Sequence, residues 1–76
     1  MIILKLRHRP SDRTTIVECA KVDVSADRDG GYVATVTSPE GTVSEFRVHA
    51  HGEYDIAYVE NSAGSTTQVI KPRMGP

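Results

Sequence analysis

Apolar and polar side chains alternate with a period of two through most of this chain. Such alternation is typical of β-strands with one buried face, and the chain is rich in Val, Ile and Thr, which favour extended backbone. No segment sustains the three- and four-residue apolar spacing of an amphipathic helix. We therefore expect an all-β fold of five or six short antiparallel strands. The strands are expected at residues 2–7, 14–25, 32–37, 43–50, 54–60 and 66–71.

The alternation changes phase in the middle of segment 14–25. Val17 and Cys19 share one parity, whereas Val22 and Val24 share the other. A strand that changes parity is expected to contain a β-bulge, because one extra residue turns the following side chains to the opposite face. The pattern predicts one long strand that bends near Cys19.

Segments 43–50 and 54–60 have the clearest two-faced patterns. Strict alternation assigns each side chain to one face of its strand. The predicted faces are Phe46, Val48 and Ala50 (inward) against Glu45, Arg47 and His49 (outward), and Tyr54, Ile56 and Tyr58 against Asp55, Ala57 and Val59.

Short segments rich in Gly, Pro, Asn, Asp and Ser separate the strands, at residues 9–12, 27–31, 38–41, 51–53 and 61–64. Such short connections favour a meander, in which consecutive strands pair and the sheet curls into a small barrel or a two-layer sandwich. We expect a single all-β domain over residues 1–71 and a flexible C-terminal tail at 72–76.

The length of 76 residues limits what this domain can enclose. A chain this short has a small core and little room for a deep, water-excluding pocket, which argues against an enzyme. Its one cysteine, Cys19, excludes an internal disulfide and favours a reducing, cytoplasmic setting. No apolar run has the length of a signal peptide or a membrane span, so we expect no membrane association.

The charges are segregated along the sequence. Residues 1–13 carry four Lys or Arg and one Asp, residues 14–60 carry three against nine Asp or Glu, and residues 61–76 carry two and no acid. The net charges are thus +3, −6 and +2, and the total is −1. A near-neutral chain can therefore present a dipolar surface to a partner.

The acidic middle segment leads to our first functional hypothesis. A negative sheet surface without catalytic residues would suit a small protein-binding module that acts on a basic partner protein, for example as an inhibitor. The small size is typical of inhibitors encoded by phages or mobile elements. The candidate partner-binding residues are Glu45, Glu53, Asp55 and Glu60.

The basic ends of the chain support an alternative, a small β-barrel that binds nucleic acid through its N-terminal strand and C-terminal tail. Its phosphate contacts would come from Lys5, Arg7, Arg9, Lys71 and Arg73, and its stacking surface from Tyr32, Tyr54 or Tyr58. The few aromatic residues and the pI of about 6.3 favour the protein-binding hypothesis.

Metal and catalytic sites have weaker support. His49 and His51 point the same way on a strand and could bind zinc with Cys19 and His8, but solvated surface histidines explain the pair more simply. Cys19 with a histidine base lacks an activating environment, so a buried thiol is expected. The acidic segment 27–30 is better explained as a turn than as a calcium loop. We expect no cofactor and no enzymatic activity, and an exposed edge strand could support a homodimer.

Overall fold

The computed structural model describes residues 1–28 and 30–72, and the secondary structure of this part of the chain is entirely β. The all-β prediction is confirmed, with seven strands. Over the same residues there is no helix long and apolar enough to cross a bilayer. The strands are β1 (Ile2–His8), β2 (Arg13–Cys19), β3 (Lys21–Ala26), β4 (Tyr32–Thr37), β5 (Val43–Val48), β6 (Tyr54–Glu60) and β7 (Thr66–Ile70).

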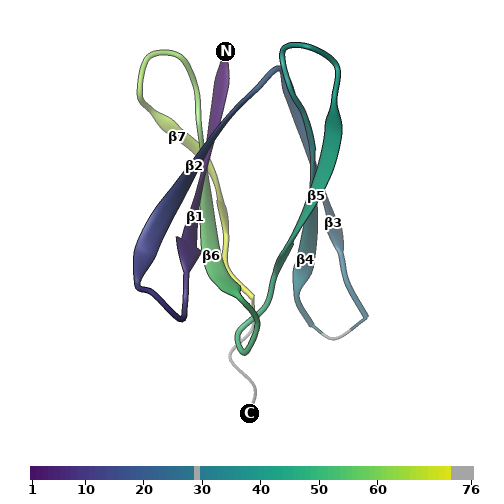
Figure 1. Cartoon of the computed structure of the whole chain (residues 1–76), viewed down its shortest axis with the longest axis vertical. Coiled ribbons are helices and arrows are strands. Elements are labelled where there is room, and N and C mark those ends of the chain that lie inside the picture. Colours follow the sequence, from purple (N-terminus) through teal and green to yellow (C-terminus); the bar gives the residue numbers. More distant parts are fainter. Residues whose placement is uncertain (29, 73–76) are drawn as a thin grey trace.

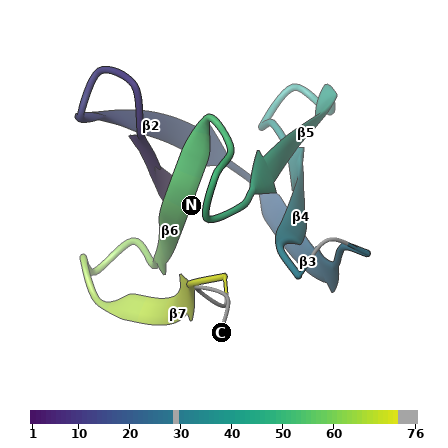
Figure 2. The same ribbon diagram turned by 90° about the horizontal axis from the view of Figure 1, so that it is seen from below.

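The strands form one mixed sheet with the order β2-β1-β6-β5-β4-β3, and β7 pairs with β6. The sheet is folded into two layers, one of β2, β1, β6 and β7 and the other of β3, β4 and β5 (Figures 1 and 2). We call these the first and the second layer. Between them, β5 and β6 pair only through the parallel bridge from Val48 to Tyr54. The sheet does not close into a barrel, and the predicted meander is wrong, because β2 and β3 do not pair and β5 and β6 share only one parallel bridge.

The predicted long strand at 14–25 is divided into β2 and β3 at Ala20. β2 pairs with β1 in the first layer, whereas β3 pairs with β4 in the second. The change of parity therefore marks the point where the chain passes from one layer to the other. Val17 contacts the core from the first layer, and Val22 and Val24 contact it from the second.

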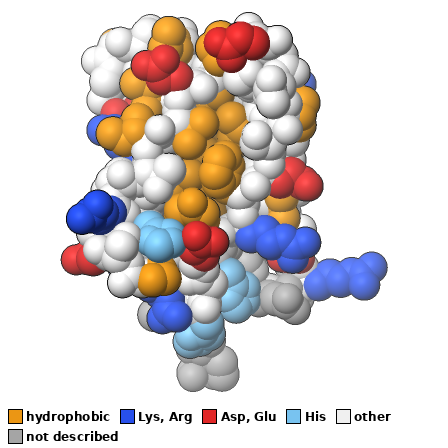
Figure 3. Space-filling view, in the orientation of Figure 1, with side chains coloured by type: hydrophobic (Ala, Val, Ile, Leu, Met, Phe, Trp, Pro, Cys, Tyr) orange, Lys and Arg blue, Asp and Glu red, His pale blue; other side chains and the backbone are white. Residues whose placement is uncertain are grey.

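The core lies between the two layers and receives side chains from both. Leu4, Leu6 and Val48 are fully buried together with the Cys19 thiol. The other buried members are Ala34, Val36, Ala57, Val59 and Ile70. Apolar side chains also reach the surface along the open seam between the layers (Figure 3), as expected for a small domain whose sheet does not close.

A close approach at Gly31 fixes the connection between β3 and β4 against the end of β5. The amide of Asp27 donates to the carbonyl of Gly31 at 2.9 Å. A Cβ on Gly31 would lie 2.5 Å from the carbonyl oxygen of Val48, so only glycine lets the chain pass this close to the end of β5.

Candidate interaction surface on the first layer

The outer face of the first layer carries a row of residues across all four strands that is apolar on β2, β6 and β7 and is interrupted by Lys5 on β1. Ile16 on β2 lies opposite Lys5 on β1, which lies opposite Tyr58 on β6, which lies opposite Val69 on β7. Ile16 is 62% exposed, Val69 52% and Tyr58 38%, so three of the five exposed large hydrophobic side chains of the described residues lie in this row. Neither Ile16 nor Val69 is among the site residues predicted from the sequence. The signal was present, because Ile16–Val17 and Val69–Ile70 are adjacent apolar pairs whose members must face opposite sides of a strand.

A shallow hollow of about 750 Å³ lies next to this row. Four cationic side chains and one carboxylate line it, which makes it positive on balance. It brings together all members of the predicted basic patch except Arg73, which lies outside the described residues. Its lining is Lys5, Arg7, Arg9, Thr14, Ala50, Asp55, Ile56, Tyr58, Lys71 and Pro72.

A β-bulge places Asp55 in this hollow. Arg7 pairs with Ile56 and His8 with Tyr54, so Asp55 is the extra residue on β6. Tyr54 consequently turns toward the core, where its ring meets that of Phe46 edge to face at 5.9 Å. The predicted faces of β6 are therefore wrong at this end, because the bulge exchanges the sides of Tyr54 and Asp55.

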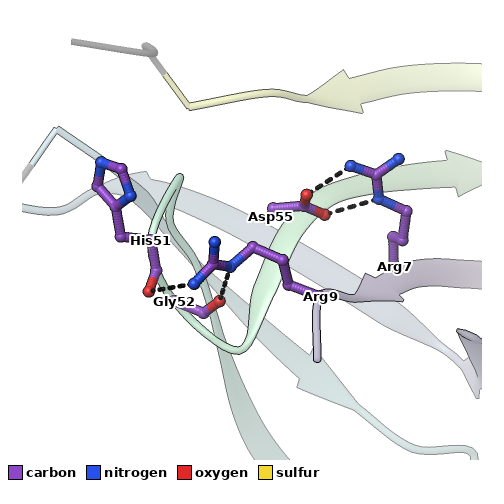
Figure 4. A network of polar contacts seen from close by, with 5 residues as sticks. All are labelled: Arg7, Arg9, His51, Gly52 and Asp55. Atoms are coloured by element: carbon purple, nitrogen blue, oxygen red, sulfur yellow. Dashed lines mark hydrogen bonds and ion pairs between the residues drawn. The ribbon is translucent and has the colours of Figure 1, made fainter. Parts of the chain in front are cut away.

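Arg7 and Asp55 form a two-pronged ion pair in the hollow (Figure 4). Nε of Arg7 donates to Oδ1 at 3.0 Å, and Nη2 donates to Oδ2 at 2.5 Å. The hydrogen bond from Arg7 lowers the pKa of Asp55, and the same contact raises the pKa of Arg7. The side chain of Asp55 is only 13% exposed while that of Arg7 is 53% exposed, so the guanidinium covers the carboxylate and remains open to solvent itself.

Arg9 has carbonyl partners instead of a carboxylate. Its Nε donates to the carbonyl of Gly52 at 3.1 Å and its Nη2 to that of His51 at 3.4 Å, as Figure 4 shows. The backbone amide of Arg9 also donates to the carbonyl of Glu53 at 2.7 Å. Arg9 thus ties the β5–β6 loop to the end of β1, and its hydrogen-bond partners there are neutral carbonyls.

The four predicted acidic residues do not form one surface. Glu60 pairs with Lys5 at 3.1 Å, and Glu53 contacts His8 at 3.0 Å. Asp55 lies in the basic hollow. Glu45 lines a second hollow of about 470 Å³, together with Glu53, Asp27 and the Phe46 and Tyr54 rings. The basic strand β1 pairs with the acidic strand β6. Opposite charges that are far apart in the sequence therefore partly neutralise one another within the sheet.

The candidate metal ligands are dispersed as well. The His49 and His51 rings are 6.1 Å apart between centroids, and His49 Nδ1 accepts a hydrogen bond from the amide of His51. His8 contacts Ser11 and Glu53, while Cys19 is in the core, where burial raises its pKa. Within residues 1–28 and 30–72, no three His, Cys, Asp or Glu side chains are grouped as metal ligands.

Comparisons with protein-family models, curated proteins and solved structures find no match to this chain. The functional assignment therefore depends on the geometry of this outer face.

Proposed function

We propose that this protein is a non-catalytic protein-binding module that docks its partner on the outer face of the first layer. The observation that carries the proposal is the row of Ile16, Tyr58 and Val69, which the fold leaves in water. The outward face of a two-faced sheet normally carries polar side chains, so three exposed apolar side chains aligned on one face, with Lys5 between Ile16 and Tyr58, are the feature that suggests an interaction site. In this proposal the protein inhibits its partner by covering part of the partner's surface.

The charges around the row indicate the chemistry of the partner. Among the described residues, Arg9 and Lys71 line the hollow without a salt bridge to a carboxylate, and Arg7 is half exposed. Tyr and Arg are the side chains most enriched at interface hot spots. A partner that offers an apolar patch with carboxylates at its edge would complement this face.

This proposal moves the binding surface away from Glu45, Glu53, Asp55 and Glu60. Three of these four acids already have a basic partner on β1, namely His8, Arg7 and Lys5. A basic protein would have to displace those contacts before it could bind the carboxylates. The apolar row requires no such exchange.

Nucleic acid is the second candidate, because the hollow brings Lys5, Arg7, Arg9 and Lys71 together. Two observations make it the weaker candidate. Tyr58 is the one aromatic side chain in the hollow lining, and stacking platforms use several. Lys5 and Arg7 are also paired with acids, which reduces the charge available for phosphates.

A matched pair of variants tests the proposal. Ile16→Glu and Val43→Glu introduce the same carboxylate in place of two apolar, β-branched side chains that are each 62% exposed, one in the row and one on β5 in the second layer. Tagged wild type and both variants would be used to capture partners from extracts of the source cells, and each candidate would then be purified and titrated. Because Ile16 would be buried in the complex, Ile16→Glu should weaken binding by at least about tenfold, and Val43→Glu should not.

Two results would refute the proposed function. The first is a purified partner that binds the Ile16→Glu variant as tightly as the wild type. The second is salt-sensitive binding of a single-stranded DNA or RNA probe that depends on Arg9 and Lys71 and not on Ile16, which would assign the hollow to nucleic acid.

A further inference from the structure

Within the described residues, β7 is an edge strand interrupted only by a β-bulge at Thr67, the extra residue between Thr66, which lies opposite Glu60, and Gln68, which lies opposite Val59. Among the described residues it pairs only with β6, and four of its five residues are exposed. Its sequence, Thr-Thr-Gln-Val-Ile, contains neither a charge nor a proline, and the exposed Val69 lies within it. Figure 2 shows β7 at the margin of the first layer, away from β4 and β5.

The other edges of the sheet differ from β7. Proteins commonly place charged side chains on edge strands, since a charge prevents another strand from adding to the ladder. β2 and β3 each pair with one neighbour, and β5 has one side unpaired before Val48. The charged residues on these strands are Arg13 and Glu18 on β2, Lys21 and Asp23 on β3, and Glu45 and Arg47 on β5.

We propose that β7 is a self-association edge, at which a second copy of this chain pairs antiparallel to the first. The neutral strand is complementary to itself, because no like charges would lie opposite one another anywhere in the ladder. With Gln68 at the two-fold axis, the two Lys71 residues are six positions apart along the ladder. That is about 20 Å at 3.3 Å per residue, beyond the screening length of about 8 Å at physiological ionic strength.

The symmetry of this pairing has a consequence for the outer face. The two-fold axis of an antiparallel pair is perpendicular to the sheet, so both outer faces lie on the same side. The two rows of Ile16, Tyr58 and Val69 would become parts of one face, with the Val69 residues near its centre. The inference does not depend on the proposed function, although the dimer would present the binding face twice.

The expected affinity is low. A five-residue ladder buries less than the roughly 1,200 Å² of a stable interface, which suggests a dissociation constant between about 10 µM and 1 mM. The association should therefore appear as a rise in mass with concentration.

Analytical ultracentrifugation of the full chain tests this, with Val69→Lys as the blocking variant and Val43→Lys as the control. Val69 is 52% exposed, so lysine fits the monomer, and Val43 is exposed on a different edge strand. From about 10 µM to 1 mM, the wild type and Val43→Lys should move from the 8.3 kDa monomer toward twice that mass. Val69→Lys should stay monomeric at every concentration. Hydrogen exchange should show concentration-dependent protection of amides in β7.

Three outcomes would overturn the inference. These are a wild type that remains monomeric at the highest concentration, a dimer that forms equally well with Val69→Lys, and protection that appears in β2 or β3 instead of β7. None of them depends on a partner protein, so the proposed function and this inference can fail separately.

Discussion

The separation between the core and the outer row can be tested with one substitution made at two isoleucines. Ile16 is 62% exposed in the row, and Ile70 is 2% exposed in the core at the end of β7. Replacing each with threonine keeps a β-branched side chain, so the preference for extended backbone is nearly unchanged. What differs between the two sites is the apolar surface that the substitution removes from contact.

The expected costs follow from burial. Only 38% of Ile16 is covered, so its folded-state burial contributes about 0.6–1.1 kcal/mol out of the 1.5–3 kcal/mol for a fully buried isoleucine. Threonine retains part of this, and the free energy of unfolding should fall by less than about 1 kcal/mol. At Ile70 the change removes buried carbon and adds a hydroxyl to the apolar core, which together should cost about 2–4 kcal/mol.

Urea denaturation followed by circular dichroism in a long-path cell measures both costs, at a concentration of about 1 µM, which keeps the chain mostly monomeric. The midpoint should shift little for Ile16→Thr and strongly for Ile70→Thr. Equal losses at the two sites would refute the reasoning, because Ile16 would then be part of the folded core and not a free binding surface.

Four further predictions concern the sheet itself. Lys5→Glu and Glu60→Lys should each destabilise by about 0.5–1 kcal/mol, and the double variant should recover most of the loss in urea denaturation. The pKa of Asp55 is lowered in the folded state, so its stabilising contribution is complete above about pH 3.9 and is lost as the pH falls through the folded pKa. The difference in unfolding free energy between the wild type and Asp55→Asn should therefore become smaller in acid. A difference that does not change with pH would contradict the ion pair. Gly31→Ala should cost about 1–3 kcal/mol by urea denaturation, since the added methyl meets a backbone carbonyl. Cys19, buried and with a raised pKa, should react with a thiol reagent at least about a hundredfold more slowly in the folded than in the urea-unfolded chain.

Local features of the fold could be predicted from the sequence because they depend on neighbouring residues. Alternation located the strand-forming segments, although β2 and β3 were predicted as one strand, and β4 has the predicted bounds of 32–37. The expected turns at 38–41 and 61–64 contain Gly41 and Gly64, both with positive φ. In the segment 14–25 the change of parity was recognised, but a bulge and a change of layer leave the same pattern in the sequence, and only the pairing partners distinguish them.

The pairing of distant strands could not be predicted in this way. β1 and β6 are separated by more than 40 residues, and alternation alone gives every strand an equally suitable apolar face. The bulge at Asp55 depends on that pairing, so the side chain was assigned to the wrong face. The proposed interaction surface could not be predicted for the same reason, because Ile16, Tyr58 and Val69 form a row only after four strands are placed in register.

The separation of charges along the sequence acquires a different meaning once β1 lies against β6. A slip of two residues would keep Leu4 and Leu6 on the apolar side, so the hydrophobic pattern cannot reject it. The ion pairs can, because a slip in one direction separates Arg7 from Asp55 and a slip in the other direction separates Lys5 from Glu60. Exposed pairs contribute about 0–1 kcal/mol each, which is little for stability but sufficient to favour one register over another. Positive and negative segments that are far apart in the chain can therefore specify which strands meet, and the recognition surface is better sought among the apolar side chains that this pairing leaves exposed.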